Sequence, residues 1–108
     1  MEFGKYQKES RKTRVDFNMR DLPYLVLALN GEAGEIAEKV KKVYRDDEGE
    51  VTKEKRKDIE KEIGDCLWYL TQIATELGLS LDEIACTNLN KLKDRKDRGT
   101  LHGEGDNR

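Results

Sequence analysis

The chain has 108 residues, of which 35% are apolar and 41% are charged, and its formal net charge at pH 7 is -2. This length fits a single domain spanning residues 1–108, with a core small enough that subunit association would help to stabilise it. The near balance of charge excludes a general attraction to nucleic acid or to anionic membranes, so any anion site must be local.

No apolar stretch approaches the roughly 20 residues that a membrane span requires, and the first ten residues lack the apolar run of a signal peptide. We therefore expect a soluble, cytoplasmic protein with no membrane partner. Cys66 and Cys86 belong to no Cys-x-x-Cys motif or Cys/His cluster, which favours buried or unreactive thiols over a disulfide.

Helical signals dominate the first half of the chain. Residues 3–13 carry a weak pattern that indicates a short leading helix. From Leu22 to Tyr44, apolar residues recur with the spacing of an amphipathic helix, with Asp21 as its expected N-cap and Pro23 in its first turn. The periodicity is then lost over residues 45–51, which we expect to form a loop.

Clear capping signals mark the second half. Thr52 is placed to cap a second long helix, and Gly78 to end it. Ser80 and Glu83 form a capping box before a third helix over about residues 81–95. The Gly-rich residues 99–108 indicate a flexible tail. We therefore predict an all-α antiparallel bundle of three to four helices, completed by oligomerisation.

An acidic motif occurs once in each long helix. The segments EAGEIA, starting at Glu32, and EIGDCL, starting at Glu62, both read acid, apolar, glycine, acid, apolar, apolar, which suggests an internal repeat. At about 100° per residue, Glu32 and Glu62 fall at the border of the apolar stripes, and Glu35 and Asp65 fall about 60° further out. If the two helices pack antiparallel, these edges bring the four carboxylates together.

Four crowded carboxylates would repel one another unless a cation offset their charge. Oxygen ligands select a hard ion, so we expect Glu32, Glu35, Glu62 and Asp65 to bind Mg²⁺, with Mn²⁺ as a substitute. The alternative is that these acids only solvate the helix surfaces. One isolated pair would favour that alternative, but two aligned pairs beside glycine favour a metal site. Glu38, on the outer side of its helix, is expected to be a solvated charge.

The third helix carries a polar edge formed by Asn88, Lys91 and Arg95, with Asn88 interrupting the apolar stripe. Lys and Arg at one edge suit phosphate recognition. Considered without the acidic motif, the same two residues would favour a structural role, with their alkyl chains at the rim of the core and their charged groups in water. Trp68 points away from the stripe of its own helix and favours a subunit interface over base stacking. His102, in the tail, is assigned no role.

Taken in order, the Glu32/Glu35 pair, the Glu62/Asp65 pair and the series Asn88, Lys91, Arg95 resemble the motifs of the MazG-like all-α nucleoside triphosphate pyrophosphohydrolases. The likeness covers about residues 22–108, and the closing GEGDNR also resembles tails in that family.

The resemblance implies a Mg²⁺-dependent enzyme that converts a nucleoside triphosphate to the monophosphate and pyrophosphate and so cleans nucleotide pools. It implies a homodimer or homotetramer. The four acids would bind the metal, Glu35 being our preference for the residue that activates water. Asn88, Lys91 and Arg95 would contact the nucleotide or its phosphates.

Two other functions remain open from the sequence. The enzyme could act on another pyrophosphate compound, such as a nucleotide-sugar, or the chain could be a helical interaction protein without catalytic activity. DNA binding is disfavoured because no helix presents an isolated basic face.

Overall fold

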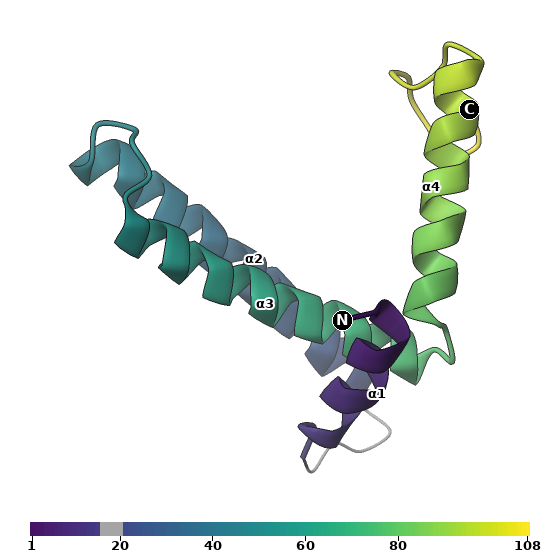
Figure 1. Cartoon of the computed structure of the whole chain (residues 1–108), viewed down its shortest axis with the longest axis horizontal. Coiled ribbons are helices and arrows are strands. Elements are labelled where there is room, and N and C mark those ends of the chain that lie inside the picture. Colours follow the sequence, from purple (N-terminus) through teal and green to yellow (C-terminus); the bar gives the residue numbers. More distant parts are fainter. Residues whose placement is uncertain (16–20) are drawn as a thin grey trace.

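A computed structural model describes residues 1–15 and 21–108 of the chain. Within these residues there are four helices and no strand: α1 (Phe3–Lys12), α2 (Asp21–Asp46), α3 (Lys53–Glu76) and α4 (Leu81–Asp97). Figure 1 shows them in order along the chain. The predicted all-α fold is confirmed, and the predicted helices match the observed ones to within a few residues.

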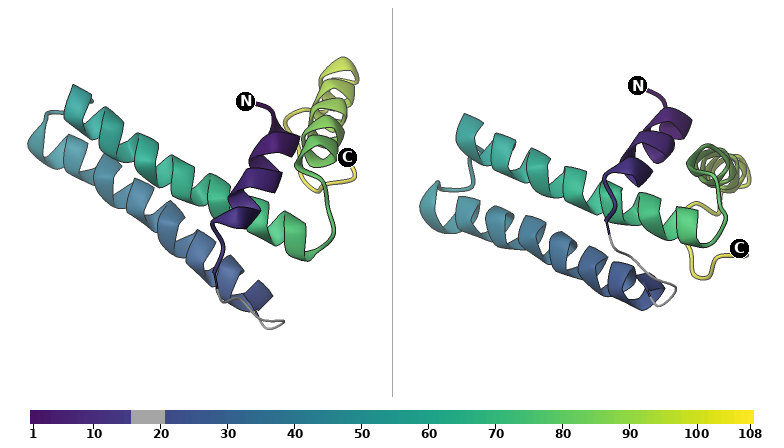
Figure 2. Two further views of the ribbon diagram at one scale, coloured as in Figure 1. Left: turned by 60° about the horizontal axis from the view of Figure 1, so that its bottom comes forward. Right: turned by 90° about the horizontal axis from the view of Figure 1, so that it is seen from below.

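The two long helices form an antiparallel hairpin, which is the largest packed unit of the fold (Figure 2). Thr52 caps α3 as predicted, because its hydroxyl accepts a hydrogen bond of 3.2 Å from the Lys55 amide. Among the described residues, the fully enclosed apolar side chains are few: Leu25 and Val43 from α2 and Ala74 from α3. The hairpin therefore has a thin core.

The short helix α1 crosses the carboxyl-terminal half of α3 through a largely polar interface. Gln72 is fully buried, and its amide donates to the hydroxyl of Ser10 at 3.0 Å. The amide of Gln7 donates to the Thr75 hydroxyl at 3.1 Å and to the Leu79 carbonyl at 2.8 Å, and its oxygen accepts from the Leu81 amide at 3.0 Å. Gln7 thus connects α1 to the end of α3 and the start of α4.

The last helix, α4, turns away from the hairpin instead of lying along it (Figures 1 and 2). Gly78 makes the turn possible because it adopts φ +67°, a left-handed conformation that glycine takes without steric cost. The Ser80 hydroxyl then accepts from the Glu83 amide at 3.3 Å and caps α4. The helix stop at Gly78 and the Ser80 half of the predicted capping box are confirmed, and α4 packs against α1.

Two sequence expectations change in this same part of the hairpin. Asp21 is the first residue of α2 and not the cap that precedes it; its carboxylate lies 3.6 Å from the buried guanidinium of Arg14, which also pairs with Glu76. Trp68 is half-buried, and its indole N–H donates to the Thr13 hydroxyl at 2.8 Å. The segment after α1 therefore covers part of the face that the sequence assigned to another subunit.

The isolated chain exposes more surface than its size requires. Its accessible area is 8440 Å², whereas a compact monomer of this mass exposes about 6200 Å². Its radius of gyration is 16.9 Å, compared with about 13 Å for a compact domain of this length. Large apolar side chains contribute to this surface, including Leu27 at 73% and Leu89 at 66% exposure. Oligomerisation stays a prediction, and these exposed apolar side chains are where another subunit would pack.

No helix in the described ranges has both the length and the apolar character needed to cross a membrane.

Candidate functional site

Three carboxylates from the α2–α3 hairpin lie close together. Glu32, Glu62 and Asp65 each offer an oxygen atom, and these atoms all lie within 4.8 Å of one another. Glu62 and Asp65 share one side of α3 because they are three residues apart on a helix. The antiparallel packing of α2 brings Glu32 beside them. Glu32 and Glu62 are half-buried and Asp65 is exposed, so the group is open to solvent on one side.

The fourth predicted ligand, Glu35, is exposed and lies outside this group of three. Its charge still acts on the group, because it is one of the carboxylates that raise the pKa of Glu32. The structure therefore brings together three of the four acids, with Glu35 one turn away on α2. The role of each acid stays a prediction.

Negative charge is concentrated at this point of the hairpin. Desolvation is the largest cause of the raised pKa of Glu32, followed by the charges of Asp65 and Glu62. Desolvation and the same acids also raise the pKa of the Cys66 thiol. The ammonium of Lys39 offsets part of the charge, since Lys39 Nζ lies 3.6 Å from Glu62 Oε1. Sequence reasoning missed Lys39, because pairing across two helices leaves no local signal.

The donor set fits a divalent cation. All three groups are carboxylates, which are the ligands that hard ions such as Mg²⁺ and Mn²⁺ prefer. A cation would also offset the repulsion from Asp65 and Glu62, which adds to desolvation in raising the pKa of Glu32. Glu32, Glu62 and Asp65 would hold it, with the exposed side left for water or a substrate.

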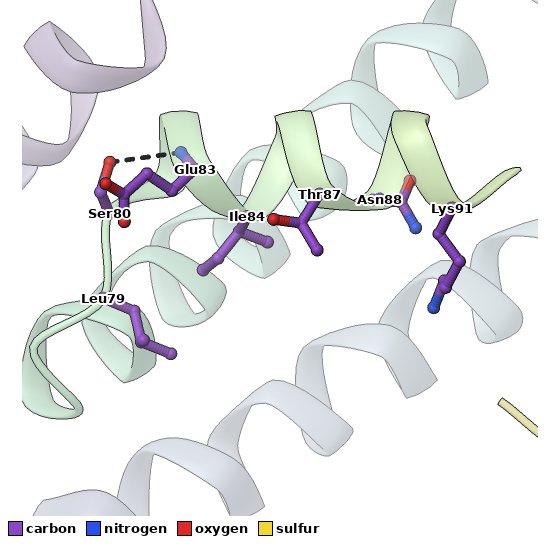
Figure 3. A pocket seen from close by; sticks show the side chains of 7 residues that line it. All are labelled: Leu79, Ser80, Glu83, Ile84, Thr87, Asn88 and Lys91. Carbon is purple, nitrogen blue, oxygen red and sulfur yellow. Dashed lines mark hydrogen bonds between the residues drawn. The ribbon is translucent and has the colours of Figure 1, made fainter. Parts of the chain in front are cut away.

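A second candidate region lies on α4. Asn88 and Lys91 line an open groove of 370 Å³ together with Thr87, Ile84 and residues at the start of the helix (Figure 3). This volume falls in the range of small-molecule sites, which begins at about 300 Å³. Asn88 is exposed, although the sequence placed it in the apolar stripe. An apolar hollow lined by Phe3 of α1 and by Leu67 and Leu70 of α3 lies beside Asn88, so those helices do not close over its side chain.

Two of the cations of α4, Lys91 and Arg95, share a partner that the sequence did not indicate. Asp106 Oδ1 lies 2.8 Å from Lys91 Nζ and 3.1 Å from Arg95 Nη2. Hydrogen bonds from Lys91 and Arg95 lower the pKa of Asp106. The one available signal was the likeness of the closing GEGDNR to tails of a known family, and it gave no partner. The flexibility of residues 99–108 stays a prediction.

Within one chain, the acids and the α4 cations are separate. The cation beside the acids is Lys39 of α2, and Lys91 and Arg95 pair with Asp106. The direction of α4, away from the hairpin, explains the separation (Figure 1).

These features define an all-α protein with a carboxylate site that suits a divalent cation. A family model for the MazG nucleotide pyrophosphohydrolase domain matches residues 22–100, and the chain belongs to this family. The match includes all four acids and the polar edge of α4, whereas Asp106 lies beyond it.

One curated relative is similar over most of the chain. The Gene 37 protein of Mycobacterium phage L5 is 50% identical over 91 residues, which cover 84% of this chain and 80% of the relative. No solved structure matches the chain.

Proposed function

We propose that the chain is a Mg²⁺-dependent nucleoside triphosphate pyrophosphohydrolase that releases a nucleoside monophosphate and pyrophosphate and thereby cleans nucleotide pools. The observation that carries the proposal is the convergence of Glu32, Glu62 and Asp65 within 4.8 Å on the hairpin of a MazG domain. Mn²⁺ is the expected substitute ion, because it accepts the same oxygen ligands.

The acids divide into two roles under this proposal. Glu32, Glu62 and Asp65 hold the ion, which when bound would offset the charge of the triphosphate and lower the pKa of water. Glu35 lies one turn from Glu32 and faces solvent, so it is placed to orient a water molecule and accept its proton. The water oxygen bonds to the α-phosphorus, and the bond from that phosphorus to the oxygen that bridges it to the β-phosphorus breaks. Pyrophosphate leaves with the electron pair of the broken bond.

The polar edge of α4 supplies the nucleotide contacts. Asn88 and Lys91 face the groove, where an amide and an ammonium suit a sugar hydroxyl and a phosphate (Figure 3). Arg95 belongs to the same predicted substrate edge. Charge on the leaving pyrophosphate would be stabilised from this side.

A homodimer or homotetramer would complete the site. The exposed area of 8440 Å² and exposed apolar residues such as Leu89 on α4 and Leu27 on α2 support association. Within one chain, α4 leads away from the hairpin that carries the acids (Figure 2). We therefore propose that the α4 of one subunit faces the acids of another.

The test is a panel of canonical and modified nucleoside triphosphates, with pyrophosphate as the readout, in the presence and absence of Mg²⁺. We expect turnover of at least one compound, dependence on the ion, and loss of activity in Glu62→Gln. Glu38→Gln is the matched control, since Glu38 pairs with Lys41 at 3.0 Å on the exposed side of α2. The proposal fails if no compound is hydrolysed at high enzyme concentration.

Nucleotide-sugars belong in the same panel, because hydrolysis of those alone would keep the metal site and change the substrate. A non-catalytic interaction protein is separated by calorimetry: it predicts no saturable uptake of Mg²⁺ or Mn²⁺, whereas the proposed enzyme binds the ion and loses it in Glu62→Gln.

A further inference from the structure

Residues 99–108 form a loop that folds back on the end of α4, and we refer to it as loop 99–108. Near the start of the loop, the Thr100 amide donates to the Arg95 backbone carbonyl at 2.8 Å. It closes through Arg108, whose guanidinium donates to the carbonyls of Thr100 at 3.1 Å and Leu101 at 2.8 Å. Arg98 of the helix end donates to the Arg108 carbonyl at 2.7 Å. The loop is therefore held at both of its ends.

Arg95 lies beneath this loop. Its side chain is only 5% exposed, and its guanidinium donates to both the carboxylate and the backbone carbonyl of Asp106. A phosphate group cannot reach this guanidinium while the loop is in place. Arg95 is thus an anchor for the loop, which differs from the direct substrate contact that its position in the motif predicts.

Lys91 has a different position. Its side chain is 36% exposed and lines the groove of α4, so a ligand in the groove can reach its ammonium (Figure 3). Asp106 Oδ1 contacts this ammonium at 2.8 Å from the loop side. A long lysine side chain loses rotamer freedom when it binds a phosphate, and a carboxylate that holds it beforehand reduces that cost.

We propose that Arg95 and Asp106 are positioning residues: Arg95 anchors loop 99–108 on α4, and through it Asp106 holds the Lys91 ammonium at the rim of the groove, where Lys91 binds a phosphate of the substrate. The identification of the ligand as a polyphosphate rests on the proposed function. Asp106 keeps its contact while Lys91 binds, because the ammonium has three donors and Asp106 uses one of them.

The first test concerns the loop and needs no turnover. Amide hydrogen exchange is measured on the full chain, with Thr100 as the reporter because its amide bonds to the Arg95 carbonyl. We expect Arg95→Met to remove the protection of loop 99–108 while α2 and α3 keep theirs. Glu104→Gln is the control, an exposed acid of the same loop for which the described structure records no ion pair. Unchanged protection of the loop in Arg95→Met would overturn the anchoring role.

The second test measures the affinity of the full chain for tripolyphosphate with Mg²⁺ by calorimetry. Asp106→Asn is expected to weaken binding by about 1.4- to fivefold, which is the range of an exposed ion pair. Glu104→Gln makes the same change in net charge and should have no such effect. In a Lys91→Met background, Asp106→Asn should cause no further loss of affinity, because Asp106 acts through Lys91.

Three results would contradict the inference: tighter binding in Asp106→Asn, which would make Asp106 a competitor of the phosphate; an equal loss in the Lys91→Met background; or no binding of tripolyphosphate. With an active nucleotide, Asp106→Asn should raise KM by the same factor and leave kcat unchanged. If the chain hydrolyses no nucleotide but the exchange and calorimetry results hold, the proposed reaction fails and the positioning roles stand.

Discussion

Replacing Asp65 by asparagine should change the stability of the protein in opposite directions with and without a divalent ion. Without the ion, Asp65 repels Glu32 and Glu62, whose oxygen atoms lie within 4.8 Å. At that separation two unit charges repel by about 0.9 kcal/mol in water and by about 3.5 kcal/mol at an effective dielectric constant of about 20. Asp65 is exposed, so the lower figure applies.

We therefore expect Asp65→Asn to raise the free energy of unfolding in EDTA by about 1 kcal/mol, or about 4 °C in Tm for a domain of this size. Asp65 is a better choice than Glu62, because Glu62 also has the ammonium of Lys39 at 3.6 Å and would lose an attraction. With free Mg²⁺ at about 100 times its Kd, the wild-type chain gains about 2.7 kcal/mol, most of which the variant should not gain.

Thermal unfolding of both chains in EDTA and in Mg²⁺ measures these effects, and the expected result is a reversal of their order. Glu38→Gln is the control, since it removes a carboxylate of α2 that pairs with Lys41 and should respond to Mg²⁺ as the wild type does. Destabilisation of Asp65→Asn in EDTA, or an increase in Tm with Mg²⁺ equal to that of the wild type, would refute the reasoning.

Three other predictions follow from the described contacts. Mixing inactive Glu32→Gln and Lys91→Met chains should restore part of the turnover, because a mixed oligomer would pair intact acids with an intact α4; no recovery would place both in one subunit. Gln7→Leu should lower the unfolding free energy measured with urea by about 1–3 kcal/mol, because it leaves the partly buried Thr75 hydroxyl and Leu81 amide without this partner. Exposed Lys8→Ala should change the same free energy by under about 0.5 kcal/mol. Because the pKa of Asp106 is lowered, its stabilisation of loop 99–108 is complete above about pH 3.9 and disappears as the pH falls through the lowered value, which amide exchange would detect.

The helices could be predicted because their signals are local. Thr52 and Ser80 cap the helices that follow them, and Gly78 ends α3, each through a hydrogen bond or a backbone conformation within a few residues. The failure at Asp21 has the opposite cause. Its carboxylate pairs with Arg14, and a salt bridge to another segment leaves no trace in the pattern around Asp21.

The difference between local signals and contacts with distant segments also explains how much of the candidate site could be predicted. Helical geometry placed Glu35 and Asp65 equally far from the apolar stripes, but Asp65 belongs to the group of three and Glu35 lies outside it. Periodicity alone therefore could not separate these two acids. Periodicity also identified the apolar face of α4, but it could not say what covers that face. The contact of Asp106 with Lys91 depends on a loop that folds back over α4, which no local rule specifies.

The glycines of the repeated motif indicate where the covering surface would lie. Gly34 and Gly64 each cost about 1 kcal/mol relative to alanine in a helix interior. A Cβ at either position would meet nothing within 4 Å in the single chain, so the packing of α2 on α3 does not require glycine there. Both residues lie next to the acids, on helices that leave apolar side chains such as Leu27 and Ile63 exposed. The cost of Gly34 and Gly64 at this open surface is explained if the backbone of another subunit or a substrate approaches it closely. A site that lies between two subunits beside the bound ion requires such an approach.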